Sequence, residues 1–413
     1  MGKAGDGTAG AGRESRRELR ARDSDATAER SDTARPASGA RPLKIVFDVS
    51  SCAKAQRKGI ANYGACLVQA AATMAPEHEL VLAVRPHRWT KRRFVEDILP
   101  GSPVRLLLDG PGARLLGNDV DVLHGIGVRL PATDRFAKVV TLHDTNVFEF
   151  PELSSPEWLA KRRARILQTV ARADLVLAMS RQGQRAITEH VGVPAERIRV
   201  VPEGVDLDRF RPAPPEDVAR VTTKLGLDDL PYVLCIGTDD GRKNHGGLLE
   251  AFAHAGLADR MRLVLAGPRG ERAETLKARA RELGLPDDRL ALTGWVEDDD
   301  LPLLLAGATT YACASLHEGF GLPVLEAQAC GVPVACSDRA ALPETLGDCG
   351  VLFDPEDIDA FAAALTRLAD DDALRADLAR RGPERVRAHY SWTRVAEQTL
   401  AAHAEALAMR SLR

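Results

Sequence analysis

The 413-residue sequence contains no apolar run that approaches the roughly 18 residues needed to span a bilayer, and no signal peptide opens it. Its net charge of −3 lacks the basic excess of a general nucleic-acid-binding protein. The seven cysteines are scattered without a Cys-x-x-Cys spacing, which argues against a zinc site and a disulfide framework. We therefore expect a cytoplasmic protein with reduced cysteines and at most a peripheral contact at the inner membrane face.

Large apolar side chains are almost absent from residues 1–41, which consist mainly of Gly, Ala, Ser, Thr, Arg, Asp and Glu. Such a segment cannot offset its ordering entropy by burial, so its composition predicts a disordered tail without a chemical role. The sequence as a whole is nevertheless 45% hydrophobic, and it is long enough for two domains with full-sized cores.

Short β-branched runs alternate with helical patterns from residue 43 onwards, which predicts an α/β fold with parallel sheets. The first unit is a buried strand over Leu43–Val49, a loop over Ser50–Gly59 and a helix from Ile60. This order predicts a Rossmann-like unit, although no Gly-x-Gly-x-x-Gly is present. Gly59 either brings its backbone near a phosphate or serves as a simple turn glycine, and the spacing alone does not separate the two.

The most distinctive stretch covers residues 315–334, where the strand Thr310–Cys313 runs into a glycine-bearing loop. Pro323 suits the first turn of a helix, and Gly331 marks its end. The free N–H groups and the partial positive charge at such a helix start favour an anion. Glu318 and Glu326 bracket this site. The alternative is that the glycines only form a turn and that Glu326, in the first turn, only stabilises the helix dipole.

Cations follow a second buried strand, Tyr232–Gly237, because Arg242 and Lys243 directly precede the next helix. Adjacent cations at a helix start oppose the helix dipole, so we expect an anionic ligand to meet them, with a simple exposed loop as the alternative. Two more strands end in histidine, at His124 and at His143. Ligands bind at such strand ends, but we interpret His124 as structural.

A basic segment over residues 85–94 contains arginine, lysine, histidine and tryptophan. It predicts either a solvated helix face or an acceptor-side surface for an anionic substrate or membrane headgroups.

The string Glu-Gly-Phe-Gly-Leu-Pro-Val-Leu-Glu-Ala-Gln-Ala-Cys-Gly-Val-Pro-Val from residue 318 to 334 resembles the donor-sugar loop of the family 4 retaining glycosyltransferases, which have the GT-B fold. The Gly-Ile-x-x-Tyr pattern at Gly59, the His-Asp pair at His143 and the Arg-Lys-Asn pattern at Arg242 resemble the same family. The resemblance implies two Rossmann-like domains that face each other across a cleft.

The same resemblance implies domain boundaries. We expect the disordered tail at 1–41, an acceptor-side domain at 42–205, a linker at 206–228, a nucleotide-sugar domain at 229–385 and a terminal helix at 386–413 that crosses back to the first domain.

The resemblance also implies the role of each site residue. Lys243 would hold the donor diphosphate with the help of Arg242, His143 would face the donor sugar, and Glu318 would accept hydrogen bonds from its hydroxyls. The expected donor-binding residues are Gly59, Phe320, Gly321, Leu322, Glu326, which would bind the ribose, and Thr238. Many relatives have an arginine at the position of Thr238, so Lys243 should carry more of the charge. Arg242 should matter less, since adjacent residues on one loop rarely face the same way.

Three aspartate clusters, at residues 119/121, 206/208 and 298–300, lie outside the donor loop, and we interpret them as structural. We therefore predict no metal and no cofactor. The predicted reaction moves a hexose from a nucleotide-diphosphate sugar, with GDP-mannose preferred over a UDP-sugar, to a small-molecule, glycan or lipid-linked acceptor. The alternatives are a nucleotide-sugar 2-epimerase, which would act on the donor alone, and a catalytically silent binding protein.

Overall fold

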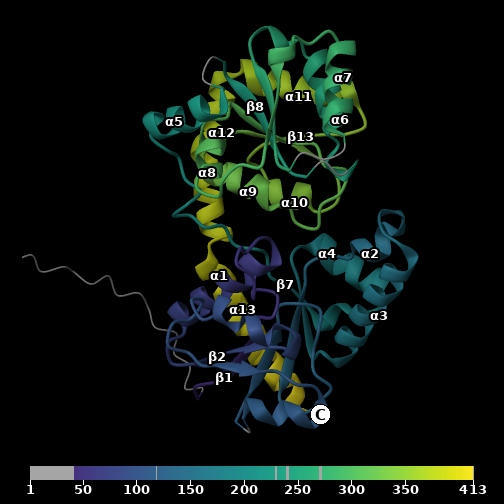
Figure 1. Ribbon diagram of the computed structural model, residues 1–413, viewed down its shortest axis with the longest axis vertical. Coiled ribbons are helices and arrows are strands. Elements are labelled where there is room, and N and C mark those ends of the chain that lie inside the picture. The colour runs from purple at the N-terminus through teal and green to yellow at the C-terminus, as the bar shows by residue number, and fades with distance from the viewer. Residues whose placement is uncertain (1–40, 118, 228–229, 239–240, 269–271, 413) are drawn as a thin grey trace, which may run out of the picture. The chain divides into compact units, whose positions relative to one another are not determined.

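The computed structural model describes residues 41–412 except 118, 228–229, 239–240 and 269–271. The predicted disorder of the N-terminal tail falls on residues outside this range, apart from Arg41. The described chain contains two parallel β-sheets with helices packed on them (Figure 1).

The first sheet has seven strands in the order β3-β2-β1-β4-β5-β6-β7. Its strands are β1 (Lys44–Asp48), β2 (Glu79–Val84), β3 (Val104–Leu106), β4 (Val122–Gly125), β5 (Ala137–Leu142), β6 (Leu175–Ala178) and β7 (Ile198–Val200). Every pairing is parallel, and β5 is buried along its whole length. The near-continuous apolar runs of the sequence thus become strands covered on both faces.

The helices of this domain are α1 (Ile60–Met74), α2 (Asn146–Glu149), α3 (Pro156–Arg172) and α4 (Arg181–Ala186), which continues as one π turn over Ile187–Val191. Ser180 caps the N-terminus of α4, because its Oγ accepts a hydrogen bond of 2.9 Å from the backbone N–H of Gly183. The basic segment forms a 3-10 helix (Pro86–Phe94) with no buried residue.

The second sheet has six strands in the order β10-β9-β8-β11-β12-β13. They are β8 (Tyr232–Ile236), β9 (Arg262–Ala266), β10 (Leu290–Gly294), β11 (Thr310–Cys313), β12 (Val334–Ser337) and β13 (Val351–Phe353). The helices of this domain are α6 (His245–His254), α7 (Ala273–Glu282), α8 (Leu301–Ala306), α9 (Leu322–Ala329), α10 (Leu342–Leu346) and α11 (Ile358–Asp370). The predicted α/β architecture of two Rossmann-like domains is confirmed.

Two helices end the chain, and one differs from the sequence prediction. The pattern predicts a helix from Asp372 to Arg381, but α12 runs over Asp372–His389 with Pro383 inside it. Packing outweighs the proline here, because Gly382 lets α12 approach so closely that a Cβ there would lie 2.9 Å from the Gln328 carbonyl oxygen. The last helix, α13 (Trp392–Ser411), packs against α1 and β5. Figure 1 shows α12 beside α9 and α13 beside α1.

The expected linker holds one further element that the sequence analysis missed. The sequence analysis predicts no helix within residues 206–228, but Pro215 opens α5 (Pro215–Leu225). Proline suits the first helical position, and Glu216 and Asp217 favour the positive end of the helix dipole. These signals were present in the sequence.

Candidate active site

The glycine-bearing loop from residue 314 to 321, here called the Glu318 loop, leads from β11 into α9. Gly321 precedes the helix with a φ of +95°, which side chains other than glycine rarely adopt, and a Cβ there would lie 2.7 Å from Leu342 Cδ2. Among the described residues, no side chain caps the N-terminus of α9. The backbone N–H of Leu322 is therefore a donor of the kind that binds anions, whereas Pro323 has no N–H and the N–H of Val324 bonds to the Gly321 carbonyl oxygen at 3.0 Å.

Phe320 is buried, and its carbonyl oxygen accepts a hydrogen bond from the hydroxyl of Thr345 on α10. This contact fixes the end of the Glu318 loop against the next helix. Glu326 lies beyond the first turn of α9, which begins at Leu322. The alternative that Glu326 merely stabilises the helix dipole from the first turn is therefore wrong.

Lys243 and Glu318 form an ion pair at the centre of the site. Lys243 Nζ lies 2.7 Å from Glu318 Oε1, and each side chain is only 16% exposed. Arg242 Nη1 lies 4.0 Å from Glu318 Oε2 and donates a hydrogen bond of 3.2 Å to the His317 carbonyl oxygen. Both neighbouring cations thus reach the same loop, so the expectation that they face different ways is wrong. The backbone N–H of Leu316 bonds to the Arg242 carbonyl, which draws the two loops together.

Two glycines make room for the Lys243 side chain. A Cβ on Gly237, at the end of β8, would lie 2.9 Å from Lys243 Cε. Gly267, after β9, has a φ of +154°, and a Cβ there would lie 2.1 Å from the Gly237 carbonyl oxygen. Burial lowers the pKa of Lys243, but the charge and hydrogen bond of Glu318 outweigh it and raise the pKa above its ordinary value. Lys243 is therefore a cation at neutral pH.

His143 follows β5 in the first domain and lies against the Glu318 loop. A Cβ on Gly319 would lie 3.1 Å from the His143 carbonyl oxygen, so only glycine fits this approach without displacement. Both residues line one hollow together with Asp144, Glu149 and Glu318. The structure therefore brings the predicted His143 and Glu318 together from different domains.

The ring of His143 has a defined protonation state. Its Nε2 lies 3.2 Å from the Ile126 carbonyl oxygen, which can only accept, so Nε2 carries the proton. Burial lowers the pKa of His143 to about 4, and the hydrogen bond to Ile126 only partly opposes this. Tyr63 holds the ring edge to face, with centroids 4.8 Å apart. His143 is thus neutral at pH 7, with Nδ1 as an acceptor.

Gly59 precedes α1 with φ +51° and ψ −127°, a conformation that requires glycine. Within the part of the chain that the structure describes, no side chain caps α1, and no atom beyond its chain neighbours lies within 4 Å of a Cβ built there. The backbone at Gly59 is therefore open to a ligand, although its conformation alone also explains the glycine. Thr238 follows Gly237 at the end of β8 and is exposed.

Glu203, in the chain segment between the two sheets, is a site residue that the sequence analysis missed. Burial, and then the charge of Glu326, raises the pKa of Glu203 to about 8. Burial also raises the pKa of Glu326 to about 7. The two carboxyl groups therefore share one environment. Glu203 lies near the end of the domain expected at 42–205, and no spacing in the sequence relates residue 203 to residue 326.

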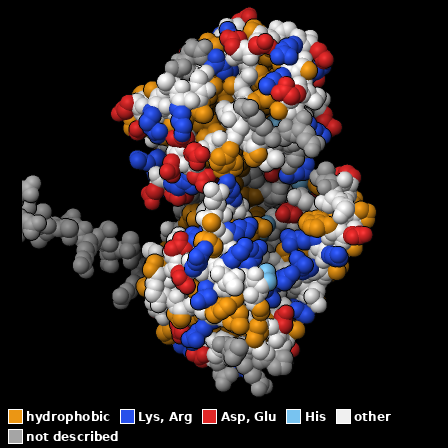
Figure 2. All heavy atoms as spheres, in the orientation of Figure 1, with side chains coloured by type: hydrophobic (Ala, Val, Ile, Leu, Met, Phe, Trp, Pro, Cys, Tyr) orange, Lys and Arg blue, Asp and Glu red, His pale blue; other side chains and the backbone are white. Residues whose placement is uncertain are grey.

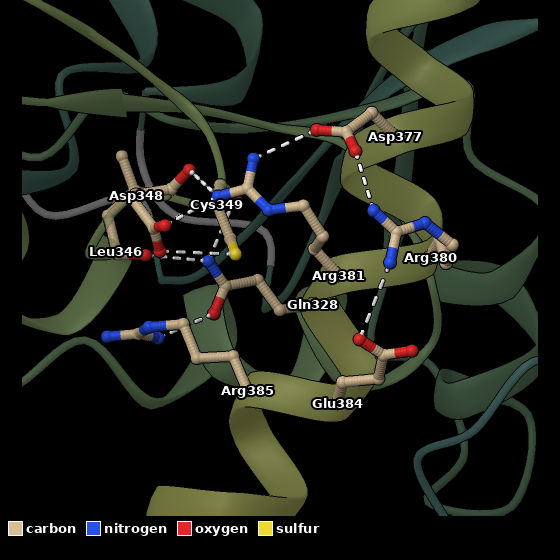
Figure 3. A network of polar contacts seen from close by, with 9 residues as sticks. All are labelled: Gln328, Leu346, Asp348, Cys349, Asp377, Arg380, Arg381, Glu384 and Arg385. Atoms are coloured by element: carbon tan, nitrogen blue, oxygen red, sulfur yellow. Dashed lines mark hydrogen bonds and ion pairs between the residues drawn. The ribbon is translucent and has the colours of Figure 1, made fainter.

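A polar network holds α9, and with it Glu326, in place (Figure 3). The buried Gln328 donates hydrogen bonds of 2.9 and 3.0 Å to the carbonyl oxygens of Leu346 and Cys349. Its Oε1 accepts a bond of 3.0 Å from Arg385 on α12. Arg381, one turn earlier, bonds to Asp348 and Asp377. One amide side chain thus ties α9 to α12 and to the segment before β13.

His124 has a structural environment, as the sequence analysis interpreted it. Its Nε2 lies 2.8 Å from Thr141 Oγ1, and its Nδ1 lies 3.0 Å from His403 Nε2 on α13. All three residues are buried, which leaves His124 no access to substrate.

The aspartate clusters also have structural contacts. Asp119 pairs with Lys44, Asp300 pairs with Lys224 and Arg220, and Asp206 accepts backbone hydrogen bonds from Asp208 and Arg209. Among the described residues, no group of three His, Cys, Asp or Glu side chains is placed to hold a metal ion. These contacts favour the structural interpretation, while independence from metals stays a prediction.

Two family profiles match the chain, one over most of the first domain and one over the second. The profile described as "Glycosyltransferase Family 4" matches residues 67–209, and the one described as "Glycosyl transferases group 1" matches residues 220–385. The O-antigen chain mannosyltransferase B of Escherichia coli is 35% identical over 68% of this chain and 74% of its own length. The chain belongs to glycosyltransferase family 4.

Two further relatives match a similar or smaller share of their own length. The MMP α-(1→4)-mannosyltransferase of Mycolicibacterium hassiacum is 31% identical over 72% of this chain and 74% of its own. The D-inositol 3-phosphate glycosyltransferase of Salinispora tropica is 36% identical over 60% of this chain and 54% of its own.

A solved structure supports the GT-B fold of this glycosyltransferase. HepE of Anabaena, crystallised with UDP and glucose, superposes with a TM-score of 0.65 at 19% identity, over 88% of this chain and 100% of that one. Within the described residues, no helix is both long and apolar enough to cross a membrane.

Proposed function

We propose that this family 4 glycosyltransferase moves a hexose from a nucleotide-diphosphate sugar to an acceptor, with retention of the anomeric configuration and without a metal ion. The observation that carries the proposal is the Lys243–Glu318 pair beside the uncapped N-terminus of α9, opposite His143. It combines a cation for a diphosphate, a carboxylate for sugar hydroxyls and a neutral histidine in one site.

The chemistry follows from where charge develops. The bond between the anomeric carbon and the diphosphate oxygen breaks, the bond to the acceptor oxygen forms, and the acceptor proton passes to the departing diphosphate. Lys243 and Arg242, with the open backbone at Gly59, would stabilise the growing negative charge. Because these cations lie on a fixed loop, they need no rearrangement as the charge grows, and a metal ion would be redundant.

The donor sugar would lie between the Glu318 loop and His143. Glu318 would accept hydrogen bonds from the sugar hydroxyls, with the backbone N–H groups of Phe320, Gly321 and Leu322 as donors. The Nδ1 atom of His143 would accept a hydrogen bond from a further sugar hydroxyl, since Nε2 already donates to the Ile126 carbonyl oxygen. Glu326 would bind the two ribose hydroxyls of the nucleotide. Thr238 would lie near the diphosphate, at the position where many relatives have an arginine.

We prefer GDP-mannose as the donor over UDP-sugars. Support comes from the relatives whose names describe mannosyltransferases, from E. coli and M. hassiacum. A thermal-shift panel of GDP-mannose, UDP-glucose and the corresponding free diphosphates tests this preference. The largest stabilisation is expected with GDP-mannose, and a larger one with UDP-glucose would contradict it.

Slow hydrolysis of the donor, with water as the acceptor, tests the reaction without a known acceptor. Proton NMR at early times should show that the released hexose has the donor's anomeric configuration. Release of the opposite anomer would overturn the retaining mechanism. Formation of the C2 epimer from donor alone would instead identify a 2-epimerase.

A further inference from the structure

Arginine side chains converge at the carboxyl end of the first sheet, away from the Lys243–Glu318 pair. Five of them line one hollow: Arg85, Arg88, Arg129, Arg162 and Arg165, together called the basic pocket. They come from the ends of β2 and β4 and from α3. An adjoining hollow shares three of these arginines and adds Lys161 and Arg172. Figure 2 shows Lys and Arg side chains gathered over this face of the domain, beside α3.

The positive charge of the basic pocket is only partly balanced by carboxylates of the described chain. Arg85 Nε bonds to the buried carboxylate of Asp48 at 2.8 Å, and Asp109 lies 3.8 Å from Arg85 Nη1. For the other four arginines, the described chain provides no carboxylate within 4 Å. Burial, followed by the charges of Arg165 and Arg85, lowers the pKa of Arg129. These cations repel one another, and an anion would relieve that repulsion.

One atom of the basic pocket lacks a hydrogen-bond partner. Arg85 is 5% exposed, and its Nη2 is buried with no acceptor among the described residues. The side chain is nevertheless rigidly held, because Asp48 fixes Nε and Ser50 Oγ accepts from the Arg85 backbone N–H at 2.9 Å. A buried donor without an acceptor destabilises the folded protein, unless a ligand accepts a hydrogen bond from it.

The basic pocket is connected to the proposed sugar site through two adjacent residues, Ile126 and Gly127. The backbone of Gly127 lines it, and the preceding residue, Ile126, accepts the hydrogen bond from His143 Nε2. The strands that lead to the two sites, β4 and β5, are hydrogen-bonded neighbours. A molecule anchored in the basic pocket would therefore lie next to the backbone that positions His143.

We propose that the basic pocket binds a phosphate or diphosphate group of the acceptor, and so orients the acceptor hydroxyl toward the donor. This rests on the proposed glycosyl transfer and names the acceptor's chemical class. Guanidinium groups bind phosphate oxygens bidentately, and several converging arginines match more than one negative charge. A soluble sugar or polyol phosphate and a lipid-linked diphosphate share this chemistry.

Binding of inorganic pyrophosphate by the full chain tests the proposal. The measurement is made by titration calorimetry in a Lys243→Ala background, so that the donor diphosphate site does not compete. The variant Arg129→Gln/Arg165→Gln removes two partly or fully exposed side chains and leaves the Arg85–Asp48 pair intact. Arg105→Gln/Arg135→Gln removes the same charge from exposed positions elsewhere in the domain.

The Arg129→Gln/Arg165→Gln pair should weaken pyrophosphate binding at least about tenfold, since each lost charge-assisted hydrogen bond is among the stronger ones in proteins. The Arg105→Gln/Arg135→Gln pair should leave it nearly unchanged. Equal affinity in the two double variants, or an equal loss in both, would overturn the proposal. Donor hydrolysis, measured separately with Lys243 present, should be similar in both double variants. An unaffected pyrophosphate affinity therefore contradicts only the proposed acceptor site, whereas an absence of donor hydrolysis contradicts the proposed function.

Vesicles distinguish the two acceptor sources. Cosedimentation with phosphatidylcholine vesicles that carry a polyprenyl diphosphate, lost in Arg129→Gln/Arg165→Gln, would assign the group to a lipid-linked acceptor. Pyrophosphate binding without such cosedimentation would assign it to a soluble phosphorylated acceptor. Cosedimentation that depends only on added phosphatidylglycerol, and falls equally in both double variants, would show a general membrane charge effect and overturn the proposal.

Discussion

Cations in two regions of the molecule have opposite relations to the protein's own carboxylates. In the second domain, Lys243 lies 2.7 Å from Glu318, so its charge is paired with a carboxylate of the protein. In the basic pocket of the first domain, four of five arginines have no carboxylate within 4 Å among the described residues. A paired cation is held in a fixed position, where it can stabilise negative charge that develops in a transition state. Unpaired cations instead favour the binding of an anionic ligand.

This difference matters because pairing affects binding and catalysis differently. An anion that approaches Lys243 competes with Glu318, so ground-state binding gains less than the full Coulomb attraction. The rigid placement still stabilises charge that develops later on the leaving group. Four of the five arginines in the basic pocket have no such competitor among the described residues, so their contribution should appear mainly in affinity. The predictions below separate these two roles.

The largest effect is expected from Lys243→Ala, which removes the paired cation. Loss of one preorganised donor at a developing oxyanion costs about 10²–10³ in kcat, and Thr238 offers no second cation. Arg242→Ala should cost less, because Arg242 lies 4.0 Å from Glu318 and also bonds to the His317 carbonyl. Both values of kcat are measured at saturating donor. If Arg242→Ala is the more damaging, the assignment to Lys243 is wrong.

Glu318→Gln removes the other half of the pair while keeping its shape. We expect kcat to fall about 10- to 100-fold, the effect of weakening hydrogen bonds to a charged group. The melting temperature should change little, since glutamine can still accept a hydrogen bond from Lys243. Thermal unfolding and steady-state kinetics on the same sample check both points. A large drop in melting temperature with unchanged kcat would make Glu318 a structural residue.

Titration of Glu326 should make nucleotide affinity depend on pH. Its pKa is raised to about 7, so the carboxylate that suits the ribose hydroxyls is fully formed only above that pH. Free diphosphate nucleotide should bind about tenfold more tightly at pH 8 than at pH 6. Glu326→Gln should bind more weakly at pH 8 and lose this dependence. An unchanged affinity in that variant would contradict the ribose assignment.

The same shift has a defined sign for stability. The folded state holds the Glu326 proton more tightly than the unfolded chain, so stability is lost as the pH rises from the ordinary glutamate range through about 7. Melting temperatures of wild type and Glu326→Gln across this range should therefore converge toward acid pH and diverge toward neutral pH, with the variant higher.

The smallest effect is expected from chelation. Because Lys243, Arg242 and the start of α9 are proposed to stabilise the leaving diphosphate, EDTA should leave the rate of donor turnover unchanged. The rate is compared before and after dialysis against EDTA. Loss of activity that Mg²⁺ or Mn²⁺ restores would show that one of the aspartate clusters is a metal site.

Local patterns in the sequence determined much of the fold. The bounds of β11 match the predicted strand Thr310–Cys313, because continuous apolar runs flanked by turn residues are typical of buried parallel strands. The cap of α4 by Ser180 is also local, because a serine side chain can accept a hydrogen bond from the backbone N–H three residues later. The motif at residues 318–334 indicates the family by itself, without any knowledge of tertiary contacts.

Tertiary structure alone decided which distant residues meet. The charge of Glu326 raises the pKa of Glu203 only because a chain segment and a helix fold together, and no spacing in the sequence encodes that approach. The helix α12 passes Pro383 because packing against α9 outweighs the local cost of proline. The five arginines of the basic pocket come from three separate segments, so their uncompensated charge exists only in the folded sheet, where the carboxyl ends of parallel strands lie at one edge.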